Sequence, residues 1–200
     1  MKTLIMDTSN TFLVVALYQD NTCLSKVVEQ GNKRQSEYAL LYVQKVLEEN
    51  HLTMKDVDEM VITIGPGSYT GVRVALTIAK TLAAVTNIRI KAISSLKAYA
   101  GMKKAISVID ARSQKVYVGI YDKGHAIIKE QLVLIDDFDK LYQEYCEYIV
   151  VGDSQLVGHA SHSIDLVEHL FELSKKQEYV ENVDVLVPHY IKDVEAKKIC

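Results

Sequence analysis

Residues 61–73 constrain the fold of this chain more than any other segment. They read Val-Ile-Thr-Ile-Gly-Pro-Gly-Ser-Tyr-Thr-Gly-Val-Arg, which is typical of a buried β-strand that enters a glycine-rich turn and then a helix. Glycine permits backbone conformations that other residues avoid, and it lets another group approach the backbone closely. The segment therefore predicts an α/β fold in which a strand and a helix meet at a crowded junction.

Two interpretations of this turn stay open. A helix N-terminus that follows a glycine-rich loop offers unpaired N–H groups to a phosphate or another anion. The spacing of Gly65, Gly67 and Gly71 is, however, one residue too long for the dinucleotide fingerprint, and the Lys-Ser/Thr pair of a P-loop does not follow Gly71. The alternative is a helix–strand junction that needs glycine for close packing.

The composition is that of an ordinary folded protein, with 48% hydrophobic and 24% charged residues. A net charge of −3 gives no overall field that would draw the chain to nucleic acid by itself. No apolar run reaches membrane-spanning length, and the N-terminal apolar residues meet Asp7 too soon for a signal peptide. Cys23, Cys146 and Cys200 lack C-x-x-C spacing and fit reduced thiols. We expect a cytoplasmic protein without membrane association.

Short apolar runs and turn signals predict the order β-β-β-α-β-α-β in the first half of the chain. Ser95 as N-cap and Gly101 as stop predict a short helix that leads into the second half. The predicted elements are strands at 3–9, 12–18 and 23–29, a helix at 36–49, a strand at 59–64, a helix ending near 85 and a strand at 89–93.

The second half begins in the same way. When residues 4–20 are laid over residues 107–123, Asp7 meets Asp110. Any two amphipathic hairpins can be aligned, but an Asp before each turn and a matched order of later elements favour a duplicated fold. The second copy lacks the run of glycines, so we expect a smaller, degenerate lobe. The later elements are a strand at 126–135, a helix at 138–145 and a strand at 148–151, and the two lobes are expected at 1–102 and 103–200.

A duplicated unit of this kind, with an Asp-containing hairpin in each half, resembles the actin-like and Hsp70-like superfamily that also holds the sugar kinases. Four short motifs make the match narrower. They are Ile5-Met6-Asp7-Thr8-Ser9, residues 65–73, Asp110-Ala111-Arg112 followed by Val116-Tyr117, and Pro188-His189-Tyr190-Ile191. These motifs resemble the bacterial TsaB (YeaZ) family, and the similarity covers nearly the whole chain. The motif at 65–73 is the most specific of the four.

The resemblance implies a non-catalytic scaffold or activating subunit of the complex that forms N6-threonylcarbamoyladenosine next to the anticodon of tRNA. Its partners would be a TsaD-like paralogue, which binds a metal and transfers the threonylcarbamoyl group, and a TsaE-like ATPase. It would meet tRNA only through the complex, and in isolation we expect a homodimer. One departure concerns Gln35-Ser36-Glu37, which stands where the family usually has His-Ser-Glu. Any activity that depends on that histidine is therefore in doubt.

In the superfamily, the two hairpins hold the phosphates and metal of ATP, so weak binding of ATP or ADP with magnesium is one expectation. Asp7 could hold the ion through water, or it could simply cap its own turn. We predict no catalytic residue and no metal site, since only His159 and His162 lie close in sequence and a G-x-S-x-G elbow is absent. The candidate nucleotide- or phosphate-binding residues are Asp7, Thr8, Ser9, Gly65, Gly67, Ser68 and Asp110.

Two enzymatic alternatives stay open beside the scaffold. One is a small ATP-dependent kinase or phosphotransferase that uses Asp7 and Asp110 around Mg-ATP. The other is a protease that acts on the paralogue, an activity sometimes proposed for the family. Turnover of ATP by the isolated chain would favour the first.

The two long helices of the first half predict a partner surface. The helix at 72–85 is apolar on two faces, which means that it is buried on two sides. Either both sides belong to the core of this chain, or one of them docks with the helix at 36–49 against an equivalent pair in a partner. The predicted interface residues are Tyr38, Leu41, Tyr42, Lys45, Val74, Ala75, Ile78 and Leu82.

Overall fold

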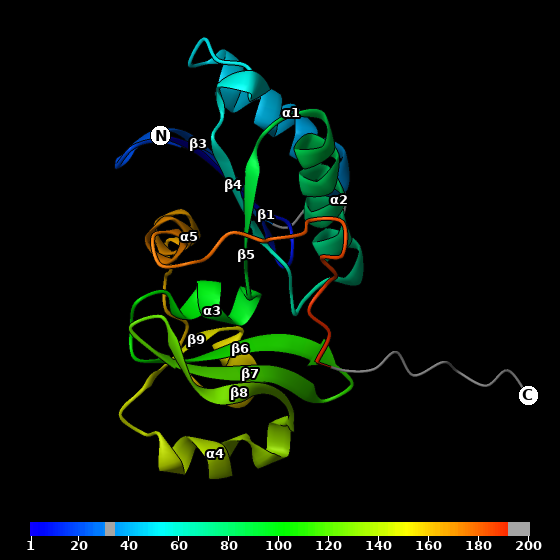
Figure 1. Ribbon diagram of the computed structural model, residues 1–200. Helices are drawn as coiled ribbons and strands as arrows, with labels where there is room; N and C mark the ends of the chain where they lie inside the picture. The colour runs from blue at the N-terminus through cyan, green and yellow to red at the C-terminus, as the bar shows by residue number, and fades with distance from the viewer. Residues whose placement is uncertain (31–34, 192–200) are drawn as a thin grey trace, which may run out of the picture.

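The computed structural model describes residues 1–30 and 35–191 of the 200-residue chain, and the side chains of Gln35 and Ser36 are outside the description. The expectations about Gln35 and Cys200 therefore lie outside the described residues. Figure 1 shows two lobes, each built around its own β-sheet.

The first sheet has the strand order β3-β2-β1-β4-β5. An antiparallel meander forms one side, and two strands parallel to β1 complete the other. Each strand begins and ends within about two residues of its predicted bounds. The strands are β1 (Lys2–Asp7), β2 (Phe12–Gln19), β3 (Thr22–Gln30), β4 (Glu59–Thr63) and β5 (Arg89–Ile93).

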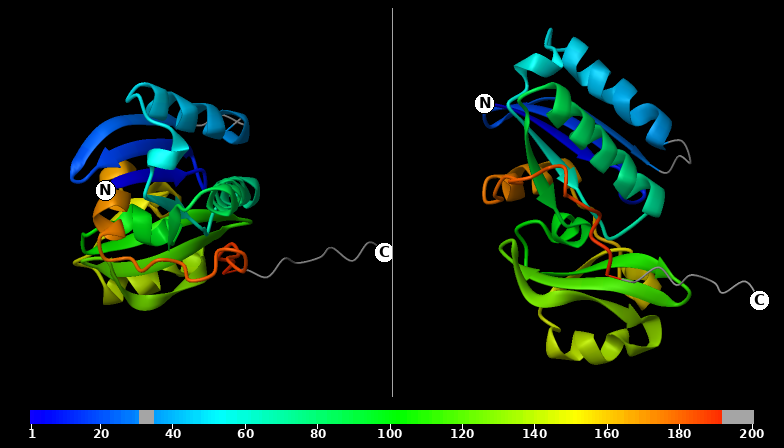
Figure 2. Two further views of the ribbon diagram at one scale, coloured as in Figure 1. Left: turned by 45° about the horizontal axis from the view of Figure 1, so that its top comes forward. Right: turned by 45° about the vertical axis from the view of Figure 1, so that its right-hand side comes forward.

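Helices α1 (Gln35–Glu48) and α2 (Tyr69–Val85) lie side by side on one face of this sheet (Figure 2). Alternate strand residues such as Leu4 and Met6 point to this face and pack against Ala39 of α1 and Ala75 of α2. The period-2 pattern of the strands and the apolar stripe of each helix thus form one core. A short 3₁₀ turn, η1 (Met54–Asp56), leads from α1 towards β4.

The opposite face of the first sheet is covered by α3 (Ser95–Ala100) and α5 (Leu166–Ser174). The ring of Phe171 on α5 stacks on Tyr18 of β2 at 3.9 Å between centroids. A helix from the far end of the sequence therefore completes the core of the first lobe (Figure 1). This helix was not predicted from the sequence.

The second sheet has the order β8-β7-β6-β9, and α4 (Phe138–Glu144) packs on its outer face. β6 pairs antiparallel with β7 and parallel with β9, as β1 does with β2 and β4. The remaining elements of this lobe are β6 (Ala105–Arg112), β7 (Lys115–Asp122), β8 (His125–Leu134), β9 (Ile149–Gly152), η2 (Ile135–Asp137) and η3 (Ser154–Val157).

The duplication extends to the turn that follows each first strand. Asp7 Oδ1 accepts the N–H of Ser9 at 2.7 Å, and Asp110 Oδ1 accepts the N–H of Arg112 at the same distance. The predicted duplicated α/β fold with a reduced second lobe is thus confirmed. The division between residues 102 and 103 stays a prediction.

One predicted N-cap was wrong, although the helix begins at Ser95 as predicted. Ser94, not Ser95, is the N-cap of α3, and its hydroxyl accepts the N–H of Lys97 at 3.5 Å. Ser95 is the first helical residue, and its hydroxyl donates to Ser9 Oγ at 2.8 Å instead. Gly101 ends the helix as predicted, with a φ of 59°.

Within residues 1–30 and 35–191, no helix combines the length and the apolar character that crossing a membrane requires.

Candidate functional site

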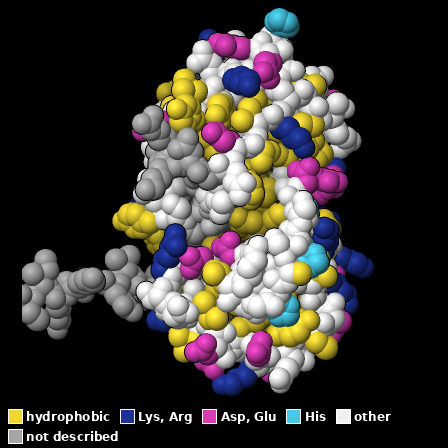
Figure 3. All heavy atoms as spheres, turned by 180° about the vertical axis from the view of Figure 1, so that it is seen from behind, with side chains coloured by type: hydrophobic (Ala, Val, Ile, Leu, Met, Phe, Trp, Pro, Cys, Tyr) yellow, Lys and Arg dark blue, Asp and Glu magenta, His cyan; other side chains and the backbone are white. Residues whose placement is uncertain are grey.

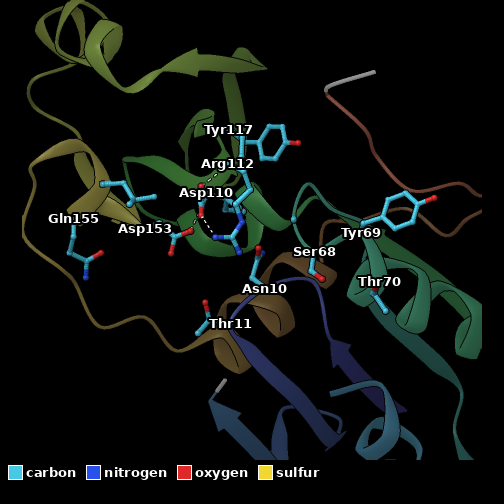
Figure 4. A pocket seen from close by; sticks show the side chains of 14 residues that line it. Asn10, Thr11, Ser68, Tyr69, Thr70, Asp110, Arg112, Tyr117, Asp153 and Gln155 are labelled. Carbon is cyan, nitrogen blue, oxygen red and sulfur yellow. Dashed lines mark hydrogen bonds and ion pairs between the residues drawn. The ribbon is translucent and has the colours of Figure 1, made fainter. Parts of the chain in front are cut away.

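A cleft of about 900 Å³ opens between the two lobes (Figure 4). The first lobe contributes the turn after β1 and the glycine-rich turn, and the second lobe contributes the ends of β6 and β9. The lining residues are Asn10, Thr11, Gly67, Ser68, Tyr69, Thr70, Ile109, Asp110, Ala111, Arg112, Tyr117, Asp153, Gln155 and Leu156.

The glycine-rich turn packs directly against the backbone of the β1–β2 turn. A Cβ atom at Gly67 would lie 2.2 Å from the carbonyl oxygen of Ser9, and one at Gly71 would lie 1.8 Å from that of Thr8. The N–H of Ser68 donates to the Ser9 carbonyl at 2.6 Å, while Ser68 Oγ accepts the N–H of Gly71 at 3.2 Å. The glycines are therefore needed for close packing, and two of the first N–H groups of the helix are already paired.

Asp7 lies beneath the cleft and is not among its lining residues. Its Oδ1 accepts hydrogen bonds from the Ser9 N–H and the Thr63 hydroxyl. Burial raises the pKa of Asp7 above 3.8, and these hydrogen bonds only partly offset the shift. The carboxyl group thus fixes the strand end and its turn.

Thr8 and Ser9 are also buried, and the Thr8 hydroxyl donates to the Gly71 carbonyl at 2.6 Å. Of the predicted nucleotide-binding residues, Gly67, Ser68 and Asp110 line the cleft, whereas a Cβ on Gly65 would meet the backbone of His189. Binding of ATP or ADP by this set stays a prediction.

The second lobe brings two carboxylates and an arginine to the cleft. Arg112 pairs with Asp110 at 2.9 Å, and the Asp110 N–H donates to Asp153 Oδ2 at 2.8 Å. Burial raises the pKa of Asp153, although that hydrogen bond opposes the shift. Figure 4 shows the three side chains together on one wall.

An aromatic and cationic group lies at the start of α2, beside the cleft. The guanidinium of Arg73 lies 3.3 Å from the ring centroid of Tyr69, and the ring of Tyr190 stacks on Tyr69 at 6.2 Å. Two motifs that stand far apart in the sequence, 65–73 and 188–191, therefore meet in space.

The neighbouring His189 links the glycine-rich turn to the second lobe. Its N–H donates to the Ile64 carbonyl at 2.7 Å, and its Nε2 lies 2.7 Å from Glu130 Oε2 on β8. The Ser94 and Tyr121 hydroxyls donate to the other oxygen of Glu130.

The hydrogen bond to Glu130 raises the pKa of His189, with burial opposing it. Burial favours a higher pKa for Glu130, but hydrogen bonds from His189, Ser94 and Tyr121 outweigh it and hold that pKa below 4.5. His189 and Glu130 therefore favour the charged state in each other.

The predicted partner surface divides into core and surface residues. Ala75 and Ile78 of α2 lie in the core, with Ile78 only 8% exposed, because this side of α2 packs on α1 and the sheet. Tyr38, Tyr42, Val74 and Leu82 are half-buried, and Leu41 and Lys45 are exposed. Seen from behind (Figure 3), the first lobe shows hydrophobic side chains gathered on its surface. Binding of a partner there stays a prediction.

The histidines considered as ligands have other surroundings. The ring of His159 packs edge-on against Tyr142 at 4.3 Å and Phe138 at 5.7 Å. Within residues 1–30 and 35–191, no group of three or more His, Cys, Asp or Glu side chains could hold a metal ion.

Residue-by-residue reasoning from the sequence missed Tyr69, Arg73, Tyr117 and Asp153 as neighbours of one cleft. A signal existed for most of them, because the first three belong to the motifs that carried the family resemblance. Their proximity depends on how the two lobes face each other, which no local pattern encodes.

Comparisons with known proteins agree with this architecture. The family model described as "TsaD: tRNA N6-adenosine threonylcarbamoyltransferase" matches residues 25–153. A protein named tRNA threonylcarbamoyladenosine biosynthesis protein TsaB from Bacillus subtilis is 29% identical over 98% of this chain and 96% of its own length. The protein of the same name from Buchnera aphidicola subsp. Schizaphis graminum is 30% identical over 75% of this chain and 77% of its own length. YeaZ from Pseudomonas aeruginosa superposes with a TM-score of 0.78, at 22% identity, over 94% of this chain and 99% of that one.

The two facing lobes, with their repeated aspartate hairpins and a cleft between them, define a protein of the actin-like α/β class. Within this class, the chain belongs to the TsaB family.

Proposed function

We propose that this chain is a non-catalytic scaffold of the complex that forms N6-threonylcarbamoyladenosine next to the anticodon of tRNA. It binds a TsaD-like paralogue, with a TsaE-like ATPase in the same cytoplasmic complex, and the isolated chain forms a homodimer. The names of its relatives in Bacillus subtilis and Buchnera aphidicola support the pathway. The surface of the first lobe supports the scaffold role.

One observation carries the proposal: α1 exposes two adjacent leucines, Leu40 and Leu41, each more than half accessible. Beside them, the rings of Tyr38 and Tyr42 stack at 5.9 Å, and the Tyr42 hydroxyl donates to Glu29 at 2.5 Å. Apolar residues grouped with ordered aromatics on a helix are typical of a protein interface. We infer that this outer side of α1 is the docking surface.

The chemistry of the cleft also supports a scaffold. A kinase built on Asp7 would need that carboxylate at Mg-ATP, whereas the side chain is buried and accepts hydrogen bonds from Ser9 and Thr63. The paralogue's metal would require a cluster of ligands that the described residues do not provide.

The test is the binding of purified paralogue to Leu41→Glu. A carboxylate placed there loses its hydration on docking at a cost of several kcal/mol, so the Kd should rise by about a hundredfold or more. Ile127→Glu is the matched control, because Ile127 is exposed to a similar degree, 46% against 54%, but lies on β8 of the second lobe.

Circular dichroism should show that both variants are folded. Normal binding by Leu41→Glu, or equal loss in the two variants, would place the interface elsewhere. Ile78→Glu is unsuitable for this purpose, because Ile78 lies in the core and its replacement would disturb folding.

A further inference from the structure

The cleft between the lobes and the tyrosines beside it play no part in the docking surface on α1. We propose that this cleft binds an unpaired nucleotide of an RNA, so that the chain contacts its RNA substrate directly. The proposal rests on the proposed role in tRNA modification and adds to it, since the resemblance alone implies contact with tRNA only through the complex.

The first support is an exposed aromatic platform. Tyr69 is 57% exposed and Tyr190 44% exposed, and their rings are nearly parallel, with 23° between their planes. Tyr117 faces the same cleft from the second lobe (Figure 4). Single-stranded RNA is recognised chiefly by stacking of its unpaired bases on tyrosine rings and arginine planes. The guanidinium carbon of Arg73 lies 3.3 Å from the centre of the Tyr69 ring and adds a positive charge to this platform.

The second support is an exposed arginine that could bind a phosphate. The Arg112 side chain is 87% exposed at the tip of the β6–β7 hairpin, where it forms an ion pair with Asp110. An ion pair so open to water contributes little. Arg112 can therefore turn to an RNA phosphate at small cost.

The third support is the pair of carboxylates in the cleft, which favours an RNA base over a metal-free nucleoside triphosphate. Asp110 and Asp153 line the same wall, and their carboxylates would repel a triphosphate that carries no magnesium. The Ser68 and Gly71 N–H groups, which could have held phosphates, are paired within the chain. A carboxylate is, however, a good acceptor for the exocyclic amino group of a base. In this arrangement, the edge of the base would face the carboxylates in the cleft, and the sugar-phosphate backbone would lie at the mouth of the cleft near Arg112.

The volume is consistent with one nucleotide. Pockets that hold molecules of this size measure roughly 300–1,000 Å³, and the cleft encloses about 900 Å³. A paired base within a duplex could not reach the inner carboxylates, so only single-stranded RNA fits.

The experiment measures fluorescence anisotropy of a labelled anticodon stem-loop RNA with the full chain, alone and assembled with its paralogue. A blunt RNA duplex of equal charge serves as the comparison. We expect the stem-loop to bind more tightly than the duplex. Tyr69→Ala should weaken stem-loop binding about tenfold, and Arg112→Ala should lower the slope of log K against log salt by about one.

Lys140→Ala is the matched control for charge, because Lys140 is 81% exposed on α4, away from the cleft. It should change neither the affinity for the stem-loop nor the discrimination against duplex. A stem-loop that carries 4-thiouridine in its loop should cross-link to peptides that contain Tyr69 or Tyr117.

The inference would be overturned by equal binding of stem-loop and duplex, by unchanged binding in Tyr69→Ala and Arg112→Ala, or by cross-links confined to other peptides. Displacement of the RNA by micromolar Mg-ATP would assign the cleft to a mononucleotide and would also overturn it. Pull-down of the paralogue by the same variants separates the two hypotheses. If the chain binds its paralogue but shows no RNA contact in the cleft, only the RNA-binding inference is refuted. The scaffold proposal is tested separately, by whether Leu41→Glu loses binding to the paralogue.

Discussion

At the scale of single residues, the glycine-rich turn depends on the absence of side chains. Gly67 lies so close to the β1–β2 turn that its Cβ would approach the Ser9 carbonyl to 2.2 Å, and its φ is 155°. We therefore expect Gly67→Ala to destabilise the protein by about 2 kcal/mol or more, through steric overlap added to backbone strain.

The control for that substitution is Gly158→Ala. Gly158 also has a positive φ, 77°, but a Cβ there would meet nothing within 4 Å. Its replacement should cost only the conformational strain, about 1 kcal/mol. Urea unfolding of both variants measures the difference. If both lost equal stability, close packing would not explain Gly67.

The sequence predicted this need for glycine, but it left the anion alternative open. The Gly71 N–H is paired locally, by the Ser68 hydroxyl, but the Ser68 N–H is paired by the carbonyl of Ser9, which is distant in sequence. The local pattern therefore could not exclude a bound phosphate. The same limit applies to Asp7. Its position before a turn was evident from the sequence, whereas its burial and its hydrogen bond with Thr63 depend on residues far away in the chain.

At the scale of elements, α5 depends on its N-cap. Asp165 Oδ1 accepts the N–H of Glu168 at 3.0 Å, and Asp165 Oδ2 pairs with Lys26 of β3 at 3.1 Å. Asp165→Ala should cost about 1 kcal/mol, because it removes the cap. Lys26→Ala should cost only a few tenths, because the ion pair is half exposed.

Thermal unfolding, with hydrogen exchange to follow the amides of α5, checks this difference. Faster exchange in Asp165→Ala but not in Lys26→Ala is the expected result. Equal effects in the two variants would mean that the ion pair, and not the cap, holds the start of the helix.

The strands and the long helices were predictable because their own patterns encode them. β2 and β4 are short apolar runs bounded by turn residues, which is typical of strands that are buried on both faces of a sheet. The outer side of α2 was not predictable in the same way. Ile78 and Leu82 look alike in sequence, yet Ile78 is buried and Leu82 is half-buried, because α1 and the sheet cover different parts of the helix. For α5, no pattern in its own sequence indicates which of the two sheets the helix covers.

At the scale of the whole molecule, the pair of His189 and Glu130 ties the two lobes together. The pKa of His189 is raised above 6.5 in the folded protein, so the charged pair contributes its full stabilisation below that value. The contribution is lost as the pH rises through the folded-state pKa. Because the pKa of Glu130 is held below 4.5, its carboxylate stays charged across this window.

We expect His189→Asn to lower the stability more at about pH 5.5 than at about pH 8.5. Denaturant unfolding of both proteins at the two pH values is the measurement. The backbone hydrogen bond from residue 189 to Ile64 is kept in the variant, so the comparison isolates the side chain. If the loss of stability caused by His189→Asn were larger at high pH than at low pH, the neutral imidazole would make the important contact.

The position of α5 also has a consequence for how the protein is made. A ribosome releases β1 to β5 first, but the sheet face that carries Ile5, Val14 and Val61 lacks Leu170 and Phe171 until α5 emerges. The whole second lobe is synthesised in between. During that interval, the nascent first lobe exposes an apolar surface of the kind that chaperones bind. The half of the chain that is translated first is therefore the half that finishes folding last.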